Sequence, residues 1–194
     1  MTSLNYVVVS TLLLTMNNET FELFFSMLSV ALLAGTLVVL VARMSYSRSS
    51  SARAIVSAFS PWALPLAAAV TTTCTLGSLY FSEIVNYKPC IMCWYQRIMM
   101  YPLAVILIIA AITKDKRVWR YATPLAAIGI VFSTYHWFLE RFPNLDAGVC
   151  DAEVPCEFVW FENFGFVTLP FMALNGFLAV LVFTTLPNTQ TEQS

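Results

Sequence analysis

Charged side chains are scarce in this sequence, at 11% of 194 residues. So little charge, together with 59% hydrophobic residues and a mean hydropathy of +0.74, lies outside the balance of a soluble globular domain. The strict alternation of apolar and polar residues that marks the strands of a membrane barrel is also missing. Since helices are the other structure that satisfies the backbone in lipid, the sequence predicts an all-α integral membrane protein.

Five apolar runs are long enough to cross a membrane, which takes roughly 20 residues. The runs are 23–42, 61–82, 91–113, 121–139 and 163–187. A shorter apolar stretch, 4–16, has no lysine or arginine before it and fits a secretory signal poorly, so we expect an interfacial helix within 1–20. We therefore predict a four-helix transmembrane bundle over 61–187, plus one extra N-terminal transmembrane helix over 21–43. Residues 188–194 would form a cytoplasmic tail.

Basic residues lie mainly in two of the loops between these runs. Seven of the ten are Arg43, Arg48, Arg53, Lys114, Lys116, Arg117 and Arg120. Because lysine and arginine mark cytoplasmic loops, both loops should face the cytoplasm. The N-terminus would then lie outside and the C-terminus inside, and the loops near residues 83–90 and 140–162 would lie on the outer side.

Four of the five cysteines fall in these two outer loops, as Cys90 with Cys93 and Cys150 with Cys156. Disulfides form and persist in that oxidising compartment. A fixed disulfide and a zinc site shared by all four are structural alternatives, and zinc is the weaker because thiolate ligands are better preserved in the cytosol. A disulfide within C-x-x-C closes a short loop and therefore stabilises the fold little. This favours a redox role for Cys90 and Cys93 over a fixed structural disulfide. We interpret Cys74, inside run 61–82, as a small buried hydrophobe.

Two ionisable residues interrupt the apolar runs close to the C-x-x-C pair. Pro89 suits the first turn of a helix, so Cys93 should lie where free backbone N–H groups and the helix dipole favour a thiolate. Arg97, at i+4 on the same face, would lower the pKa of that thiol further. Arg97 could instead be an interfacial anchor, and His136 a satisfied core residue. Ionisable residues inside a membrane usually face the bundle interior and serve function, so both point to a site with the cysteines.

Three segments resemble the DsbB/BdbC family of membrane disulfide-forming oxidases. They are PCIMCWYQRIMMYP at 89–102, YHWFLE at 135–140 and CDAEVPC at 150–156. The resemblance covers 61–187, whereas the preceding residues depart from the usual four-span pattern. It implies a thiol:quinone oxidoreductase of the bacterial inner (plasma) membrane that supports disulfide bond formation, with its cysteine loops on the extracytoplasmic side. The short 150–156 spacing is closer to the BdbC-like branch.

The resemblance also implies a route for electrons. Cys150 would accept attack by a soluble extracytoplasmic oxidase with a thioredoxin fold, similar to DsbA, and Cys156 would relay electrons to Cys90. The Cys90 and Cys93 pair would then reduce a membrane quinone, either ubiquinone or menaquinone, with Cys93 nearest the ring.

The same resemblance makes Arg97 and His136 the residues that polarise the quinone. Neither G-x-G-x-x-G nor a P-loop signature occurs, so a lipid-soluble acceptor suits the site better than a nucleotide. Membrane lipid, quinone and the oxidase are the expected partners, without nucleic acid or a metal.

Two alternatives stay open. A vitamin K epoxide reductase-like enzyme shares the chemistry but places its C-x-x-C in a late helix, whereas the pair here is early. A non-enzymatic membrane protein with static disulfides or a metal site would have no cysteine that cycles with quinone.

Overall fold

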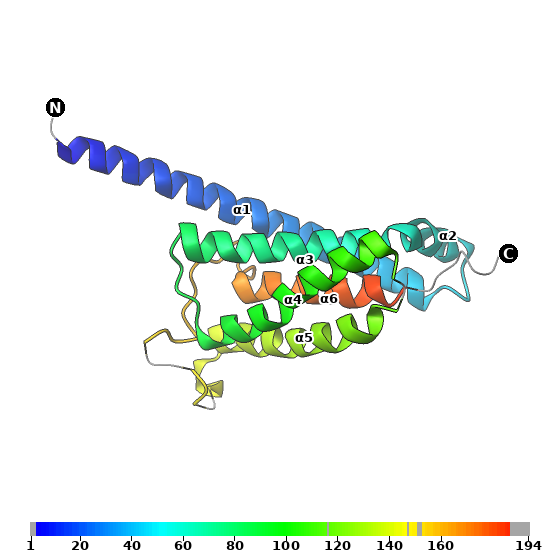
Figure 1. Ribbon diagram of the computed structural model, residues 1–194. Coiled ribbons are helices and arrows are strands. Elements are labelled where there is room, and N and C mark those ends of the chain that lie inside the picture. Colours follow the sequence, from blue (N-terminus) through cyan, green and yellow to red (C-terminus); the bar gives the residue numbers. More distant parts are fainter. Residues whose placement is uncertain (1–2, 116, 147, 151–152, 187–194) are drawn as a thin grey trace.

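The protein is almost entirely helical (Figure 1). The computed structural model describes residues 3–115, 117–146, 148–150 and 153–186, and for residues 3–17 the helical backbone alone. Its α-helices are α1 (Ser3–Met44), α2 (Ser50–Phe59), α3 (Ala63–Leu79), α4 (Ile91–Thr113), α5 (Trp119–Arg141) and α6 (Leu169–Thr184). A short 3-10 turn, Ser60–Trp62, joins α2 to α3, and a π-helical turn, Tyr80–Ile84, extends α3. The prediction of an all-α protein is confirmed.

Four of these helical stretches are long and apolar enough to cross a membrane. They are Asn18–Met44, Ser50–Ile84, Ile91–Thr113 and Trp119–Arg141. Large apolar side chains such as Val105, Ile112 and Val131 are exposed on their outer faces, where hydrocarbon rather than water would meet them. The chain is therefore a multi-pass membrane protein.

The fifth expected span, 163–187, is helical over only part of its length. Asn163 and Val167 form a β-bridge around Phe164 and Gly165, whose φ angles of 57° and 74° do not continue a helix. The helix α6 therefore begins at Leu169 and has 16 residues, or about 24 Å at 1.5 Å per residue. That is shorter than the roughly 30 Å of a hydrocarbon core, so a fifth crossing does not follow from length.

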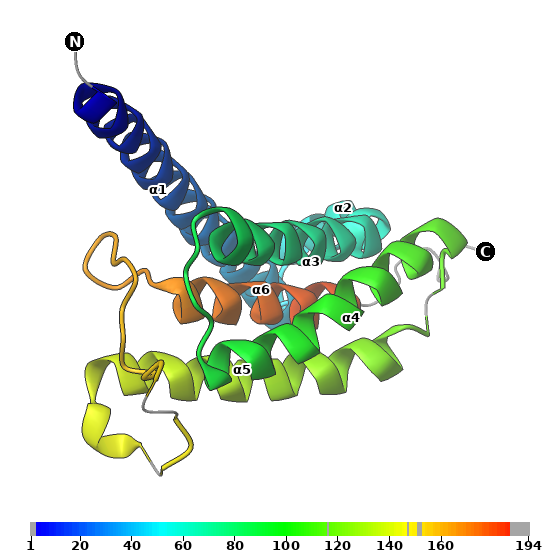
Figure 2. The ribbon, with the colours of Figure 1, turned by 60° about the vertical axis from the view of Figure 1, so that its left-hand side comes forward.

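Helix α6 nevertheless lies at the centre of the bundle, between α3 and α5 (Figure 2). Asn175, Gly176, Phe177 and Val180 are all buried on it. On α5, a Cβ added at Gly129 would lie 2.4 Å from the Phe177 ring. The absence of a side chain at Gly129 thus allows α5 and α6 to pack closely, as small residues do between membrane helices.

The N-terminal part of the chain is one element. Residues 4–16, expected as a separate interfacial helix, and residues 21–43, expected as an extra span, lie in the single helix α1. This helix packs on α6 and α2. The expected cytoplasmic tail, 188–194, lies outside the described residues.

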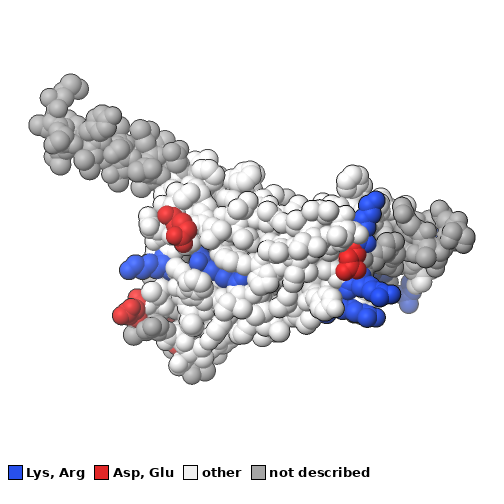
Figure 3. All heavy atoms as spheres, viewed as in Figure 1, with Lys and Arg blue, Asp and Glu red and all other residues white. Residues whose placement is uncertain are grey.

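The two ends of the bundle differ in charge (Figure 3). Both cysteine pairs lie at the end formed by the start of α4 and the segment between α5 and α6, here called the cysteine end. The opposite end, here called the basic end, holds α2 and the turn between α4 and α5, and its cations include Arg43, Arg53, Lys114 and Arg117. The segregation of charge that the sequence indicated is therefore present in the fold.

Candidate thiol–disulfide site

The C-x-x-C pair wraps around the start of α4. Cys90 is the N-cap residue, with extended backbone angles, and its Sγ accepts a hydrogen bond from the Cys93 backbone N–H at 3.4 Å. The two sulfur atoms lie 3.1 Å apart. A cap with this geometry places one sulfur at the positive end of the helix dipole. We expected Cys93 to gain most from the helix start, but the structure gives that hydrogen bond to Cys90 because Cys90 is the cap.

His136, on α5, packs against Cys90. Its Nε2 lies 3.6 Å from the Cys90 Sγ and 3.2 Å from the carbonyl oxygen of Cys156. Its Nδ1 lies 3.0 Å from Nε2 of Gln96, and all these groups are buried. With the Gln96 amide N–H donating to Nδ1, the Nε2–H is free to donate toward the sulfur and the carbonyl. Gln96 thus orients the imidazole.

These contacts act on the ionisation of Cys90, which precedes the first residue of α4. A hydrogen bond from the Cys93 thiol, assisted by His136, lowers the pKa of Cys90 well below the usual range of a thiol. Burial acts in the opposite direction and is outweighed. Cys90 is therefore the sulfur that this arrangement favours as a thiolate.

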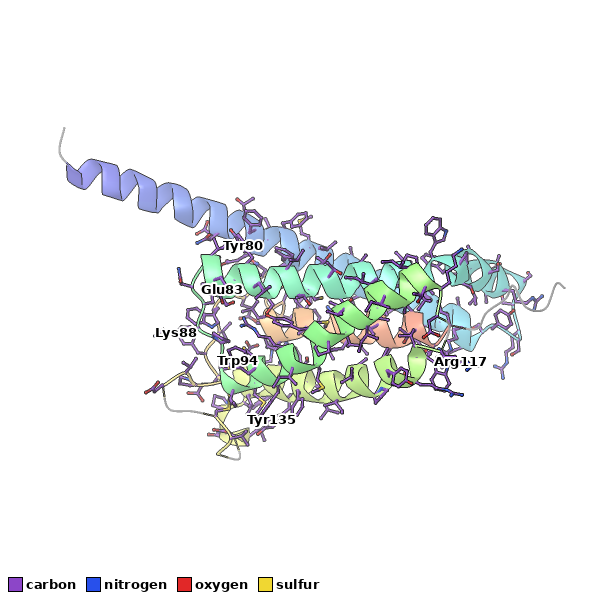
Figure 4. The ribbon with its side chains drawn as sticks, viewed as in Figure 1. Tyr80, Glu83, Lys88, Trp94, Arg117 and Tyr135 are labelled. Atoms are coloured by element: carbon purple, nitrogen blue, oxygen red, sulfur yellow. A yellow bond between two sulfur atoms is a disulfide. The ribbon has the colours of Figure 1, made fainter. Side chains whose placement is uncertain are left out.

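Arg97 lies one turn after Cys93 on α4. Its Nη2 donates a hydrogen bond to the Ser78 carbonyl oxygen at 3.2 Å, and its guanidinium carbon lies 5.3 Å from the centre of the Trp94 ring. Lys88 and Trp94 stand next to the start of α4 in Figure 4. The i+4 spacing predicted that Arg97 and Cys93 share a face, and both contribute to the wall of one cavity.

That cavity has a volume of about 330 Å³. Its walls are mainly apolar and come from α1, α3, α4, α6 and the segments that connect them, with Lys88, Gln96 and Arg97 as its charged or amide-bearing side chains. Of the predicted site residues, Cys93 and Arg97 line it. Cys90 and His136 are not among the residues that line it, and His136 lies beside the Cys90 sulfur.

The second cysteine pair forms a disulfide, Cys150–Cys156, with the Cα atoms 5.7 Å apart. Cys156 is buried and belongs to one apolar cluster with Cys90 and Leu139, whereas Cys150 is partly exposed at the edge of that cluster. The sequence placed the two pairs on the same side of the membrane, and the fold brings them into contact. One sulfur of the second pair faces inward and the other lies nearer the surface.

A metal ion could use part of this cluster. The ligand atoms of Cys90, Cys93 and His136 lie within 4.8 Å of one another, which suits a three-ligand site. The four-cysteine zinc site is not formed, because Cys150 and Cys156 are joined in a disulfide and offer no thiolate.

Two site residues were missed by the sequence reasoning. Gln96 was overlooked although an amide within an apolar run is a signal for a buried hydrogen bond. Glu140 was counted only as an outer charge, yet its side chain is 3% exposed and its Oε2 accepts a 2.6 Å hydrogen bond from Thr168. Glu140 stands one turn from His136, which brings a buried carboxyl group close to the cysteine cluster.

A helical membrane protein with a C-x-x-C pair at a helix start and a second cysteine pair packed against it is a membrane thiol–disulfide protein. Residues 60–186 match the sequence pattern of the family described as "Disulfide bond formation protein DsbB". The chain belongs to this family, as the three motifs predicted, and this membership implies thiol oxidoreductase activity.

Named relatives agree with this family. The chain is 48% identical to the probable disulfide formation protein C 1 of Bacillus cereus (strain ATCC 10987 / NRS 248) over 109 residues, which cover 56% of this chain and 78% of that protein. It is 43% identical to the disulfide bond formation protein C of Bacillus subtilis (strain 168) over 131 residues, which cover 66% and 90%. No solved structure matches the chain. Since the family match begins at residue 60, α1 and α2 lie outside it.

Proposed function

We propose that this chain is a membrane thiol:quinone oxidoreductase. It reoxidises a soluble extracytoplasmic oxidase with a thioredoxin fold and passes two electrons to a membrane quinone, which supports disulfide bond formation. The observation that carries the proposal is the placement of the two cysteine pairs: they pack against each other, and one sulfur-bearing residue, Cys93, lines an apolar cavity together with Arg97.

In the membrane, the cysteine end faces the extracytoplasmic side and the basic end faces the cytoplasm, in keeping with the positive-inside rule. Helix α6 makes the fifth crossing. Its shortness is accommodated because neighbouring helices surround it, and irregular backbone at membrane depth is tolerated where protein buries it. Helix α1 is then an additional N-terminal span beside the four-helix core of the family.

Exchange begins at the outer disulfide. A thiolate of the soluble oxidase attacks the Cys150 sulfur, which forms a mixed disulfide and releases Cys156 as a thiolate. The oxidase's second thiol then attacks the mixed disulfide, so that the oxidase leaves oxidised and Cys150 leaves as a thiol. The partial exposure of Cys150 and the burial of Cys156 support this division of roles.

Electrons next move inward between the pairs. The Cys156 thiolate attacks Cys90 in a Cys90–Cys93 disulfide and releases Cys93 as a thiolate at the cavity wall. Cys150 then attacks Cys156, which restores the outer disulfide and releases Cys90. The Nε2–H of His136, 3.6 Å from the Cys90 Sγ, stabilises the negative charge on that sulfur as it leaves.

The cavity suits a quinone. It joins apolar walls to a few polar groups, the usual composition of a small-molecule site, and Arg97 supplies a permanent positive charge next to Cys93. A quinone bound there would supply the two-electron acceptor, taking two electrons and two protons as the Cys90–Cys93 disulfide re-forms. Arg97 holds anionic charge at the cavity, while Gln96 and His136 keep the Cys90 sulfur in place.

The decisive experiment mixes the purified protein with a reduced thioredoxin-fold oxidase and a quinone, and follows quinone absorbance. Stoichiometric quinone reduction is expected, and Cys93→Ser should abolish it. A protein whose cysteines stay in one redox state throughout would be a static disulfide protein, and the proposal would be rejected.

The order of exchange has its own test. When the second cysteine of the soluble oxidase is replaced by serine, its mixed disulfide with Cys150 should accumulate, because no second oxidase thiol remains to release Cys150. Non-reducing electrophoresis with peptide mapping measures it. If the soluble oxidase instead forms its mixed disulfide with Cys90, the proposed order of exchange is wrong.

A further inference from the structure

Helix α1 presents one stripe of mostly small or polar residues to the rest of the bundle. The buried members of the stripe are Ser26, Ser29, Thr36, Val39 and Ala42. Large apolar side chains such as Phe24, Met27 and Val38 are exposed on its other side. Small residues let helix backbones approach closely in a membrane, and hydroxyl groups bond across the interface. The pattern is that of a helix packed as part of the bundle.

Hydrogen bonds fix α1 near the cysteine end. Three residues spaced by one turn each bond to the core. The pairs are Glu22 with the Tyr87 hydroxyl, Ser26 Oγ with Asn163 Nδ2 at 2.9 Å, and Ser29 Oγ with Asn175 Nδ2 at 2.8 Å. At the basic end, Arg43 bonds to the Thr185 hydroxyl. These contacts set the rotation of α1 about its own axis, and so decide which side chains it points inward.

Residues on and beside this face of α1 form part of the cavity wall. Phe25, Leu28, Ser29 and Leu32 line it, a set that covers two turns, or about 10 Å of helix. On α3 the lining residues extend from Ser78 back to Ala69, about 14 Å along the helix axis. The cavity therefore continues from Cys93 and Arg97 toward the middle of the bundle, well beyond the reach of a single ring.

A chain of contacting aromatic residues, one pair edge-to-face and two pairs stacked, lines the cavity near the cysteine end. Phe25 meets Phe81 with ring centres 5.7 Å apart, Phe81 stacks on Tyr87 at 5.9 Å, and Tyr87 stacks on Trp160 at 4.5 Å. All four line the cavity. On α3, a Cβ at Gly77 would lie 3.1 Å from the Phe25 ring, so the glycine leaves room for this aromatic contact. If a quinone ring binds at Cys93, its hydrocarbon chain can extend toward the middle of the bundle along the apolar residues of α1 and α3.

We propose that α1 forms the wall that holds the hydrocarbon chain of the acceptor, and that it thereby selects quinones with a long isoprenoid chain. This inference rests on the proposed function and assigns a role to a helix that lies outside the family match. The ring binds at Cys93 and Arg97, and Leu28 and Leu32 contact the chain.

Photolabelling tests this placement directly, without turnover. A long-chain quinone with a photoreactive group in its chain is irradiated with the purified full-length protein, and labelled peptides are mapped. Label is expected in α1 between Phe25 and Leu32, and excess unlabelled quinone should suppress it. A probe with the photoreactive group on its ring should instead label α4 near Cys93. Chain label confined to the other helices would overturn the proposal.

Substitutions give a second, kinetic test. Leu32→Trp narrows the cavity and should raise the KM for a long-chain quinone about tenfold, the scale at which apolar pockets discriminate. The KM for a short-chain quinone with the same ring should change much less. Met27→Trp, on the exposed side of α1, is the matched control and should alter neither KM.

The outcomes separate this inference from the proposed function. If the native protein reduces neither quinone, the proposed function fails. If it reduces both, but Leu32→Trp affects them equally or Met27→Trp matches it, the role of α1 alone is refuted. Should Leu32→Trp fail to fold, the photolabelling of the native protein decides.

Discussion

Cys90 and Cys93 are close in sequence and in space but have different surroundings. Cys90 is the buried cap of α4 and lies against His136, whereas Cys93 lines the cavity with Arg97. One sulfur therefore lies against the second cysteine pair and the other lines the cavity. At the scale of single residues, the proposed function uses this asymmetry: the dithiol would receive electrons on one side and release them on the other.

Arg97 should affect only the second half of the proposed reaction, the transfer of electrons from the cysteines to the quinone. A charge-assisted contact at a partly buried site contributes about 1.5–3 kcal/mol, so Arg97→Gln should lower the quinone turnover rate roughly ten- to a hundred-fold. Arg97→Lys keeps the charge but not the planar fork and should lose less. Single-turnover oxidation of the partner without quinone should stay unchanged. A normal quinone rate in Arg97→Gln would leave Arg97 as an interfacial anchor.

The reactivity of Cys90 should depend on pH in a direction set by its lowered pKa. A thiol with a lowered pKa remains a thiolate below the usual thiol range and is protonated only as the pH falls through its own pKa. Alkylation of reduced Cys90 by iodoacetamide should therefore slow little between about pH 8 and pH 6. His136→Phe removes the second of the contacts that lower this pKa, after the Cys93 hydrogen bond, so its rate should fall more over that interval than the native rate, as measured by mass spectrometry. If the alkylation rate depends on pH in the same way in the native protein and in His136→Phe, His136 does not lower the pKa of Cys90.

At the scale of elements, close helix packing positions the site. Helix α6 lies between its neighbours because α5 carries Gly129 where the Phe177 ring approaches. The same α5 carries His136 to Cys90 and Glu140 to Thr168. The packing of α5 on α6 therefore controls the geometry of the cysteine cluster as well as the stability of the bundle.

Substitution at Gly129 should show this dependence. Gly129→Ala places a Cβ about 2.4 Å from the Phe177 ring and should cost about 1–3 kcal/mol of unfolding free energy through overpacking. The midpoint of thermal unfolding in detergent measures the loss. Gly35→Ala on α1 is the control, since nothing lies within 4 Å of the added Cβ there and no loss is expected. Equal midpoints for both variants would contradict the packing argument.

At the scale of the whole molecule, charge and chemistry occupy opposite ends of one bundle. Several basic residues gather where α2 and the turn between α4 and α5 lie, and both cysteine pairs lie at the far end. A protein inserted with its basic end in the cytoplasm would present its disulfides to the oxidising side. Orientation in the membrane is thus a condition of the proposed activity.

Labelling in intact cells tests that orientation. A membrane-impermeant maleimide should modify Asn144→Cys at the cysteine end from outside, because this position is exposed. Asp115→Cys, exposed at the basic end, should react only after permeabilisation. Mass spectrometry of the labelled peptides distinguishes the introduced cysteines from the native ones. Modification of position 115 in sealed cells would place the basic end outside and refute the oxidising role.

Local features were predictable from sequence because they depend on neighbouring residues. Scarcity of charge identified the apolar helices, and the expected run 91–113 coincides with α4. The i+4 spacing placed Arg97 with Cys93, and the motifs around Cys90, His136 and Cys150 indicated the family that the comparison established. The start of α6 was predicted too early, since an apolar run does not reveal the turn around Phe164.

Tertiary structure decided what depends on how helices rotate and approach one another. Whether His136 meets a sulfur or the cavity depends on the rotation of α5 within the bundle, and contacts with α6, such as Gly129 with Phe177 from a distant part of the chain, help to set that rotation. The inward face of α1 is likewise set by its bonds to Tyr87, Asn163 and Asn175. Composition determined that this chain is a helical membrane protein, and the spacing of its cysteines and motifs indicated its family. The packing between distant segments determined that Cys90 lies against the second cysteine pair and that Cys93 lines the cavity. No local sequence pattern encodes the relative rotation of two helices.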